Sequence, residues 1–291
     1  MTDGKIVHVV GTGTIGEPLI GLLCDAKEEL GIDEVTFYKH NAKLIDRPKI
    51  KGLVNRGASL AVAEQKIKDF QELGTDPTYE AEEAIKRASV VIDCTPKGTG
   101  LMNKEKYYNK YKSKVKGFLA QGSEFGFGKM YAVGINDREI TKNDKFIHIV
   151  SCNTHNIAVL IKTLAMENNK NHLKEGKFLC IRRSNDVSQV KSFVPSPEVG
   201  AHTDEAMGTH HARDVYHLYK TLDMDLNVFS SALKLNTQYM HSIWYDLKID
   251  KKITKEKAIQ KLIDNPRVSV TQKKAANLVF SFGRDHGHYG R

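Results

Sequence analysis

The sequence has 291 residues, of which 40% are hydrophobic and 27% are charged. This composition is ordinary for a globular protein and excludes a disordered chain, and the length is sufficient for two domains with their own cores. No apolar run approaches the roughly 20 residues needed to cross a bilayer, and the first residues lack a secretory h-region. We therefore expect a cytoplasmic protein that does not bind membranes.

The net charge of +9 comes from lysines and arginines that are spread along the chain. Because they do not gather into one arm, they favour small anions and phosphorylated substrates over nucleic acid as partners.

The cysteines lie far apart and form no CxxC pair: Cys24, Cys94, Cys152 and Cys180. This spacing argues against a metal site and against a disulfide framework, so a thiol can be free for chemistry.

Apolar runs alternate with helical periodicity in the first half of the chain. We expect strands at 5–10, 34–38, 89–94, 117–120 and 146–150, and helices at 15–30, 58–73 and 79–88. A polar, lysine-rich stretch at 39–57 interrupts the pattern. Strands that alternate with helices predict a parallel sheet with helices on both faces, which is a doubly wound α/β domain.

The pattern changes after Cys152. A helix is expected at 157–168, β-rich segments at 178–183, 230–236 and 239–249 with a helix between them, and a strand-like run at 277–282. We place a domain boundary near residue 150. Residues 1–150 would form the doubly wound domain and residues 151–291 an α+β domain.

The residues Gly11-Thr12-Gly13-Thr14-Ile15-Gly16 form a GxGxxG that follows an expected strand and opens an expected helix. Such glycines allow a tight turn, a close approach of the backbone to a pyrophosphate, and close packing of the helix on the strand. The alternative is an ordinary glycine turn. In this strand–turn–helix context the motif predicts a dinucleotide-binding domain over residues 1–150.

The choice between the two dinucleotides depends on the end of the second strand. NAD sites usually carry a carboxylate there for the ribose hydroxyls, whereas this chain has Tyr38-Lys39-His40-Asn41. A lysine would attract a 2′-phosphate, so NADP is favoured over NAD. The alternative is that Lys39 is only solvated.

A second loop follows the strand at 89–94, with the sequence Asp-Cys-Thr-Pro-Lys-Gly-Thr-Gly at 93–100. The carboxyl ends of the strands are where α/β sheets bind ligands. The loop is therefore a candidate wall beside the nicotinamide. A plain surface turn is the alternative.

Cys152 follows the strand at 146–150 and precedes an apolar helix, within Ser151-Cys152-Asn153-Thr154. A cysteine at the start of a helix is stabilised as the thiolate by backbone N–H groups and the helix dipole. Ser151, Asn153 and Thr154 are also good capping residues. Cys24 and Cys180 lie in apolar periodicity and are expected in the core. Cys152 is therefore the candidate nucleophile.

Taken in order, the GTGTIG fingerprint, the DCTPKGTG segment and Ser-Cys-Asn-Thr resemble the archaeal (type II) glyceraldehyde-3-phosphate dehydrogenases. The resemblance runs from about residue 5 to about residue 250. Further segments match in the same order: Gln121-Gly122, Ile181-Arg182-Arg183, Val194-Pro195-Ser196-Pro197, Thr209-His210-His211 and Tyr239-Met240-His241.

The resemblance implies a role for each matched residue. Cys152 would form a thiohemiacetal with the aldehyde and a thioester after hydride transfer, and His241 would be the general base. The implied substrate-binding residues are Ser151, Asn153, Arg182, His210 and His211. The implied cofactor-binding residues are Gly11, Gly13, Thr14, Ile15, Gly16, Lys39, Gly122 and Arg183.

Two of these roles also have a basis in the residue types alone. Imidazole suits proton transfer near neutral pH, and guanidinium groups hold phosphate through paired hydrogen bonds. From the residues alone, however, Arg182 and Arg183 are more typical of surface ion pairs, and His241 is more typical of a buried core histidine.

The chain departs from the family pattern in two places. His155-Asn156 replaces the small Thr-Gly pair that usually follows Ser-Cys-Asn-Thr, which puts bulk and an extra donor beside the nucleophile. The chain also ends at Arg291, where relatives continue into a further strand and a C-terminal helix. It is therefore either a fragment or a form without the tail.

The resulting prediction is a reversible, NADP- or NAD-linked conversion of glyceraldehyde 3-phosphate and inorganic phosphate into 1,3-bisphosphoglycerate, a step of glycolysis and gluconeogenesis. The family resemblance adds a homo-oligomer, specifically a homotetramer. The alternatives are a related semialdehyde or acyl-phosphate reductase, and a catalytically silent nucleotide-binding protein. The reactivity of Cys152 discriminates between an enzyme and a binding protein.

Overall fold

The computed structural model describes residues 4–168, 170–185 and 193–285; the chain's last residues, 286–291, lie outside this range. The chain divides into two compact units, Met1–Met130 with Ile140–Val150 and Tyr131–Glu139 with Ser151–Arg291. No helix within the described ranges is long and apolar enough to cross a membrane.

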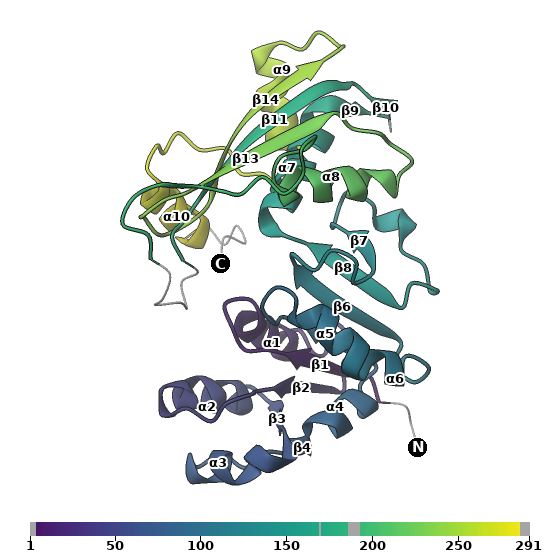
Figure 1. Cartoon of the computed structure of the whole chain (residues 1–291), viewed down its shortest axis with the longest axis vertical. Helices are drawn as coiled ribbons and strands as arrows, with labels where there is room; N and C mark the ends of the chain where they lie inside the picture. Colours follow the sequence, from purple (N-terminus) through teal and green to yellow (C-terminus); the bar gives the residue numbers. More distant parts are fainter. Residues whose placement is uncertain (1–3, 169, 186–192, 286–291) are drawn as a thin grey trace. The chain divides into compact units, whose positions relative to one another are not determined.

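The first unit contains an eight-stranded sheet with the order β4-β3-β2-β1-β5-β6-β8-β7 (Figure 1). Its strands are β1 (Ile6–Val10), β2 (Glu34–Tyr38), β3 (Ala58–Val62), β4 (Tyr79–Glu80), β5 (Val90–Asp93), β6 (Gly117–Gly122), β7 (Lys129–Tyr131) and β8 (Phe146–Val150). All neighbouring strands from β4 to β8 pair in parallel. From β1 the chain adds strands first toward one edge of the sheet, to β4, and then from β5 toward the other edge. Such a switch point, here between β1 and β5, is where open α/β sheets bind ligands.

Helices cover both faces of this sheet. They are α1 (Gly16–Asp25), α2 (Arg47–Asn55), α3 (Ile67–Glu72), α4 (Ala81–Arg87), α5 (Thr99–Asn103) and α6 (Asn109–Tyr111), with the 3₁₀ turns η1 (Leu44–Asp46) and η2 (Glu64–Lys66) and the π-helical segment η3 (Lys104–Tyr108). One core joins Ile20 of α1 and Leu53 of α2 to the sheet. A separate core joins Ile85 of α4 and Tyr108 of η3 to it. The predicted doubly wound architecture is therefore confirmed.

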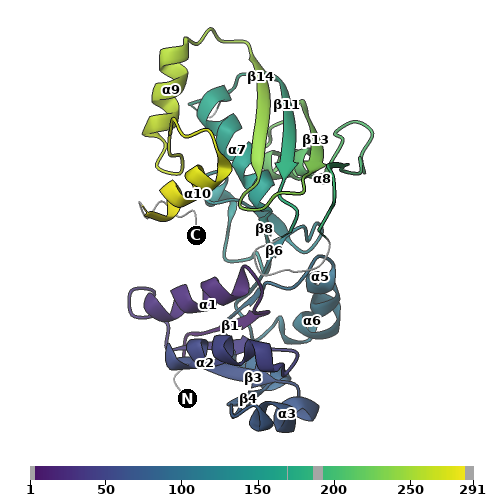
Figure 2. The same cartoon turned by 90° about the vertical axis from the view of Figure 1, so that its left-hand side faces the viewer.

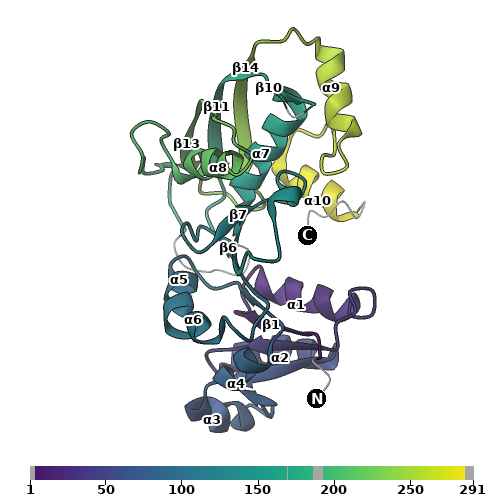
Figure 3. The same cartoon turned by 90° about the vertical axis from the view of Figure 1, so that its right-hand side faces the viewer.

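The second unit is built on a mixed four-stranded sheet of order β12-β13-β11-β14. Its strands and helices are β9 (Met166–Glu167), β10 (Lys170–Asn171), β11 (Leu173–Arg182), β12 (Glu198–Val199), β13 (Val228–Lys234), β14 (Ser242–Ile249), α7 (Cys152–Ala165), α8 (His210–Lys220), α9 (Lys255–Asp264) and α10 (Ala276–Asp285), with the 3₁₀ turn η4 (Asp137–Glu139). Figure 2 shows α7 and α8 behind the three long strands. In Figure 3, α9 lies beside α7. This α+β arrangement agrees with the expected fold class.

Several expected elements were wrong. Residues 58–62, expected as helix, form β3, because this short apolar run is buried in the middle of a parallel sheet and tertiary burial outweighs helix propensity. Residues 277–282, expected as strand, lie in α10, where Phe280 contacts the ring of Tyr239 at 5.9 Å between centroids. The polar stretch at 39–57 contains α2.

Two boundaries also moved. The helix expected at 157–168 begins at Cys152 and ends at Ala165. The strand expected from residue 239 begins at Ser242, so His241 lies in the preceding loop and not inside a strand. Tyr239 has φ +86°, a left-handed conformation that interrupts an extended chain.

Candidate functional site

The glycine loop between β1 and α1 depends on two positions where no side chain fits. Gly11 has φ +101°, and a Cβ there would lie 3.0 Å from the carbonyl oxygen of Cys94. A Cβ on Gly16 would lie 2.0 Å from the carbonyl oxygen of Gly11. The loops after β1 and β5 therefore pack backbone against backbone at the switch point of the sheet.

The middle of the same loop is open. A Cβ on Gly13 would meet no atom within 4 Å, and Ile15, the residue before α1, makes no side-chain cap at the start of the helix. Backbone N–H groups at a helix start bind phosphate groups favourably. The residues present therefore fit the pyrophosphate of a dinucleotide.

Asp93 shapes the loop that follows β5. Its carboxylate is 2% exposed and accepts hydrogen bonds from the N–H of Thr95 at 2.9 Å, from Asn103 at 2.8 Å and from the hydroxyl of Tyr108 at 2.5 Å. Burial and the neighbouring carboxylate raise the pKa of Tyr108, so it stays a donor. Asp93 begins the loop motif at 93–100, but no local pattern in the sequence predicted that its carboxylate would bind Asn103 and Tyr108.

Glu124 holds the other side of this loop. It is 1% exposed and accepts from the backbone N–H of Gly98 and, at 3.1 Å, from that of Leu101. A Cβ on Gly100 would lie 3.2 Å from this carboxylate. No local signal pointed to Glu124, because it acts on residues more than 20 positions earlier in the chain.

Lys39, the candidate for a 2′-phosphate, is held in an ion pair. Its Nζ lies 2.9 Å from Oδ2 of Asp46, and Oδ1 of Asp46 lies 4.0 Å from Nζ of Lys49. Lys49 also donates to the carbonyl oxygen of Thr12 at 3.2 Å. The structure therefore links the end of β2 to the glycine loop through α2, which the sequence analysis missed.

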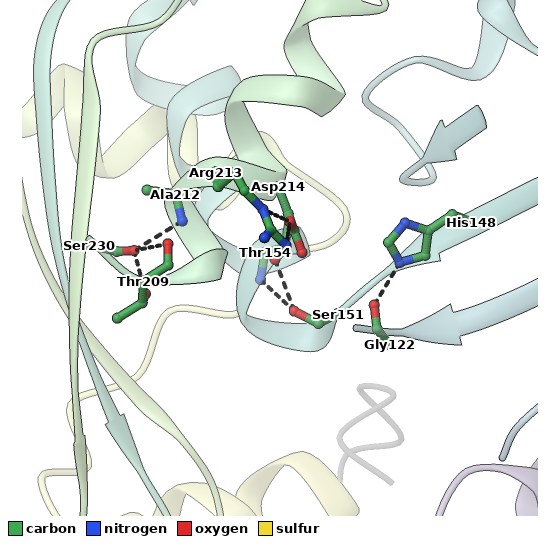
Figure 4. A network of polar contacts seen from close by, with 9 residues as sticks. All are labelled: Gly122, His148, Ser151, Thr154, Thr209, Ala212, Arg213, Asp214 and Ser230. Carbon is green, nitrogen blue, oxygen red and sulfur yellow. Dashed lines mark hydrogen bonds and ion pairs between the residues drawn. The ribbon is translucent and has the colours of Figure 1, made fainter. Parts of the chain in front are cut away.

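Gly122 ends β6 in a left-handed conformation with φ +90°. His148 of β8, which is fully buried, donates from Nε2 to the carbonyl oxygen of Gly122 at 2.7 Å (Figure 4). The backbone at this strand end is thus held by a neighbouring strand of the same sheet.

Cys152 is the first residue of α7, and its side chain is exposed. Ser151 caps the helix by accepting from the N–H of Thr154 at 3.4 Å, and the hydroxyls of Ser151 and Thr154 are 2.9 Å apart (Figure 4). The other cysteines are less suited to chemistry, since burial raises the pKa of Cys94 and of Cys180 to about 12. Cys152 thus combines exposure with a helix start.

The start of α8 is anchored to β13. The hydroxyl of Ser230 accepts from the N–H of Ala212 at 2.9 Å and lies 2.6 Å from the hydroxyl of Thr209 (Figure 4). Thr209 is the N-cap residue but its own side chain makes no capping hydrogen bond, so Ser230 satisfies a free N–H of the first turn instead. It fixes His210 and His211, whose ring centroids are 3.9 Å apart.

His211 joins α7 to a group of basic side chains. Its Nε2 lies 3.4 Å from Nδ2 of Asn153, the residue next to Cys152. Burial, together with the neighbouring side chains of His210, Arg182 and His241, lowers the pKa of His211 to about 3. The second unit therefore brings together Asn153, Arg182, His210, His211 and His241 from four separate segments.

His241 is positioned by the neighbouring strand end. Its Nδ1 accepts from the backbone N–H of Arg183 at 3.1 Å. When Nδ1 accepts, the neutral ring carries its proton on Nε2. Arg183, expected near the cofactor, belongs to the second unit with Arg182.

A buried carboxylate behind this cluster was missed. Asp214, on the same helix as the histidine pair, is fully buried, and its Oδ1 accepts from Arg213 at 2.8 Å and 3.0 Å (Figure 4). An aspartate inside a helix gives no signal in the sequence that it is buried.

His155 acts elsewhere than expected. Its Nε2 donates to the carbonyl oxygen of Val133 at 3.1 Å, and Lys162, two turns along α7, donates to the carbonyl oxygen of Gly134 at 2.6 Å. The residue that was expected to add a donor beside the nucleophile instead anchors the segment at 131–139.

The second unit also holds a cavity of about 650 Å³, lined by residues that include Lys162, Tyr219 and Met224. These residues lie at or just beyond the carboxyl ends of α7 and α8, whereas Cys152 and His211 lie at the amino ends of the same helices. The cavity is therefore separate from Cys152 and the group of Asn153, Arg182, His210, His211 and His241, which together we call the thiol cluster. Among the described residues, no group of three or more His, Cys, Asp or Glu side chains could hold a metal ion.

Comparison with known proteins places the chain beside archaeal proteins named glyceraldehyde-3-phosphate dehydrogenase. It is 29% identical to the protein of Methanobacterium formicicum, with 93% of this chain and 75% of that protein covered. It is 28% identical to that of Metallosphaera sedula, with 92% and 74% covered. With the protein of Pyrobaculum neutrophilum the identity is 24%, over 97% of this chain and 78% of the relative. No protein-family model matches the chain.

Proposed function

We propose that the protein is a phosphorylating, NAD(P)-dependent glyceraldehyde-3-phosphate dehydrogenase that acts through a thioester on Cys152. The observation that most supports this proposal is the exposed thiol at the first position of α7. It lies in the same unit as a cluster of Asn153, Arg182 and three histidines. The similarity to archaeal proteins of that name supports the choice of aldehyde.

The chain's own groups have separate tasks in this reaction. Sγ of Cys152 attacks the aldehyde carbon, and the carbonyl oxygen becomes the hydroxyl of a thiohemiacetal. Hydride loss from that carbon gives the thioester, and the hydroxyl proton leaves to a base, the role proposed for His241. Inorganic phosphate then displaces the thiolate and forms the acyl phosphate. Arg182 and the His210–His211 pair supply donors for the substrate phosphate.

The dinucleotide would be held by the glycine loop and, when bound, accepts the hydride. We propose NADP as the preferred form, because Lys39 directly follows β2 and no carboxylate stands among residues 38–41. Gly11 and Gly16 shape the loop, Gly13 leaves room for the pyrophosphate, and Gly122 would lie along the nicotinamide.

Selective alkylation and one substitution test the thioester. Iodoacetamide should label Cys152 before Cys24, Cys94 and Cys180, because burial raises the pKa of each of the other three thiols. Cys152→Ser should abolish turnover while dinucleotide binding, measured by titration, is retained. Full activity of this variant, or prior labelling of Cys94, would contradict the assignment.

The two alternatives give different results in a substrate screen. Glyceraldehyde 3-phosphate with inorganic phosphate should be turned over fastest among several aldehydes. A related semialdehyde or acyl-phosphate reductase would prefer another substrate but still need Cys152. A binding protein would bind a dinucleotide and turn over none of them.

We also propose a homo-oligomer, with the outer face of the second unit's sheet as the contact. Figure 2 shows α7 and α8 on the opposite face. Leu179 of β11 pairs with Trp244 of β14, and Leu233 of β13 with Val199 of β12; Trp244 is 58% exposed and Val199 76% exposed. On β11, Ile181 pairs with Leu233, and Ser231 is the polar residue that pairs with Leu179. An apolar strip of this kind is typical of a contact between subunits.

Size-exclusion chromatography with light scattering tests the contact. The wild-type chain should elute as an oligomer, and Trp244→Lys should shift it toward the monomer. The control is Ile259→Lys on α9, another apolar side chain, which is 39% exposed and lies outside the strip. Equal shifts of both variants would contradict the proposed contact.

A further inference from the structure

We propose that Asp46 is a specificity-determining residue for the dinucleotide, because its carboxylate competes with a 2′-phosphate for the ammonium group of Lys39. The proposal rests on the dinucleotide site of the proposed function. It concerns which form of the dinucleotide that site accepts, and to what degree.

The position of Lys39 makes the competition direct. Lys39 is the first residue after β2, where the fold places the 2′ position of the ribose. Its side chain is 16% exposed, that of Asp46 is 19% exposed, and the charged atoms are 2.9 Å apart. Because both groups are largely withdrawn from water, solvent and salt screen the pair less than a surface pair. A 2′-phosphate reaches Lys39 only by displacing Asp46 or sharing the lysine with it.

Asp46 also acts on the lysine that touches the glycine loop. Its second oxygen lies 4.0 Å from Nζ of Lys49, which is 3.0 Å from Glu17 and donates to the carbonyl oxygen of Thr12. Two ammonium groups are thus matched by two carboxylates. The end of β2 therefore offers an incoming phosphate less net positive charge than its lysines suggest.

The carboxylate is not needed to start α2. Asp46 is the N-cap residue, yet its side chain accepts no hydrogen bond from the first turn. Asparagine and serine are equally good N-cap residues. Replacing Asp46 by either removes the negative charge and keeps a residue that suits the start of the helix.

The expected effect follows from the charges. Without Asp46, Lys39 lacks its counterion and Lys49 keeps only Glu17, so a phosphate monoester finds an unmatched cation. NADP carries that group and NAD carries a hydroxyl at the same position. Asp46→Asn should therefore strengthen NADP binding and leave NAD binding nearly unchanged.

Calorimetric titration of the full chain with each oxidised dinucleotide is the test. In Asp46→Asn the ratio of the NAD Kd to the NADP Kd should rise about tenfold, which corresponds to a change of about 1.4 kcal/mol in relative binding free energy. Asp46→Ser should change the ratio in the same direction, which guards against a defect peculiar to one variant. Glu17→Gln, which removes a partner of Lys49 alone, should leave the ratio within about twofold.

A double substitution isolates the pair. In a Lys39→Met background, Asp46→Asn should change the ratio by less than about twofold, since the competing lysine is gone. A full tenfold effect in that background would overturn the proposal, as would equal changes of both Kd values in Asp46→Asn. If the wild-type chain bound neither dinucleotide, the proposed function itself would be overturned.

Discussion

The glycine loop of the first unit and the thiol cluster of the second are built by opposite means. The loop keeps its shape because side chains are absent, with Gly11 and Gly16 allowing backbone to pack on backbone. The cluster keeps its shape because polar side chains are present: Ser230 anchors α8, and the ring of His241 accepts from the backbone N–H of Arg183. Adding one methyl group should therefore damage the loop, whereas the cluster should respond to the loss of one functional group.

The difference should appear in what each substitution changes. A loop built by steric fit supports binding and local stability, and a side-chain cluster supports a chemical step with less effect on the fold. Four predictions test this division, from the largest expected effect to the smallest.

His241→Asn should lower kcat by roughly 10²–10⁴, the usual contribution of general acid–base catalysis, with little change in the dinucleotide Kd. Because the N–H of Arg183 donates to Nδ1, accepting a proton at Nε2 requires the ring proton to move to Nδ1 and that contact to open. Single-turnover kinetics with glyceraldehyde 3-phosphate would measure the chemical step.

His241→Gln is the matched variant, because its amide cannot act as a base but its side chain is long enough to donate a hydrogen bond from near the position of Nε2. A base at this position predicts that both variants lose activity alike. If the glutamine variant kept most of the rate, His241 would be a hydrogen-bond donor to the substrate oxygen and the base would lie elsewhere.

Arg182→Ala should raise the KM for a phosphorylated aldehyde by roughly 10–100-fold, as expected for a hydrogen bond to a charged group worth about 1.5–3 kcal/mol. The same enzyme should change little toward an unphosphorylated aldehyde. Arg183→Ala serves for comparison, since the backbone N–H that holds His241 remains in it. Equal losses on both aldehydes would indicate a structural role for Arg182.

Gly16→Ala should destabilise the first unit by about 1–3 kcal/mol, the usual cost of overpacking, and weaken dinucleotide binding about tenfold. The added Cβ would meet the carbonyl oxygen of Gly11 at 2.0 Å. Gly52→Ala is the control, because this helical glycine has open space around its Cβ position, so the substitution should stabilise by about 0.5–1 kcal/mol. Thermal unfolding and titration measure the two effects. Unchanged dinucleotide binding in Gly16→Ala would contradict the claim that the loop depends on the absence of side chains.

Local sequence patterns were sufficient for the loop and for a helix after the strand at 146–150, although the first residue of that helix was placed five positions too late. A GxGxxG after a strand, and a Ser-Cys-Asn-Thr before a helix, each concern neighbouring residues, and the doubly wound fold follows from alternating strands and helices. Residues 58–62 were wrong because a short apolar run fits a buried strand as well as a helix. Contacts between distant positions gave no signal at all. Asp46 engaging Lys39, Glu124 holding the loop at 98–101, and Ser230 anchoring α8 all depend on the packed fold.

The smallest expected effect is a loss of stability at acidic pH, to which one buried histidine in each unit contributes. Burial lowers the pKa of His8 in the first unit and of His211 in the second to about 3. Between pH 6.5 and 3 the unfolded chain binds these protons and the folded chain does not, so stability falls as pH falls through 6.5. Each group should cost about 1.4 kcal/mol per pH unit across that interval.

His8→Gln isolates the first of these contributions. Nδ1 of His8 lies 2.7 Å from the hydroxyl of Thr36, and glutamine can keep a hydrogen bond there without titrating. The variant should lose less unfolding free energy than the wild type when urea unfolding at pH 5 is compared with that at pH 7.5. Thr36→Val removes the partner but keeps the histidine, so it should lower stability at both pH values and leave the pH dependence as in the wild type. His8 belongs to the parallel sheet and not to the thiol cluster, so its replacement should also leave kcat unchanged. A fall in kcat would mean that a substitution in the sheet affects the chemical step, and that the two regions are not independent.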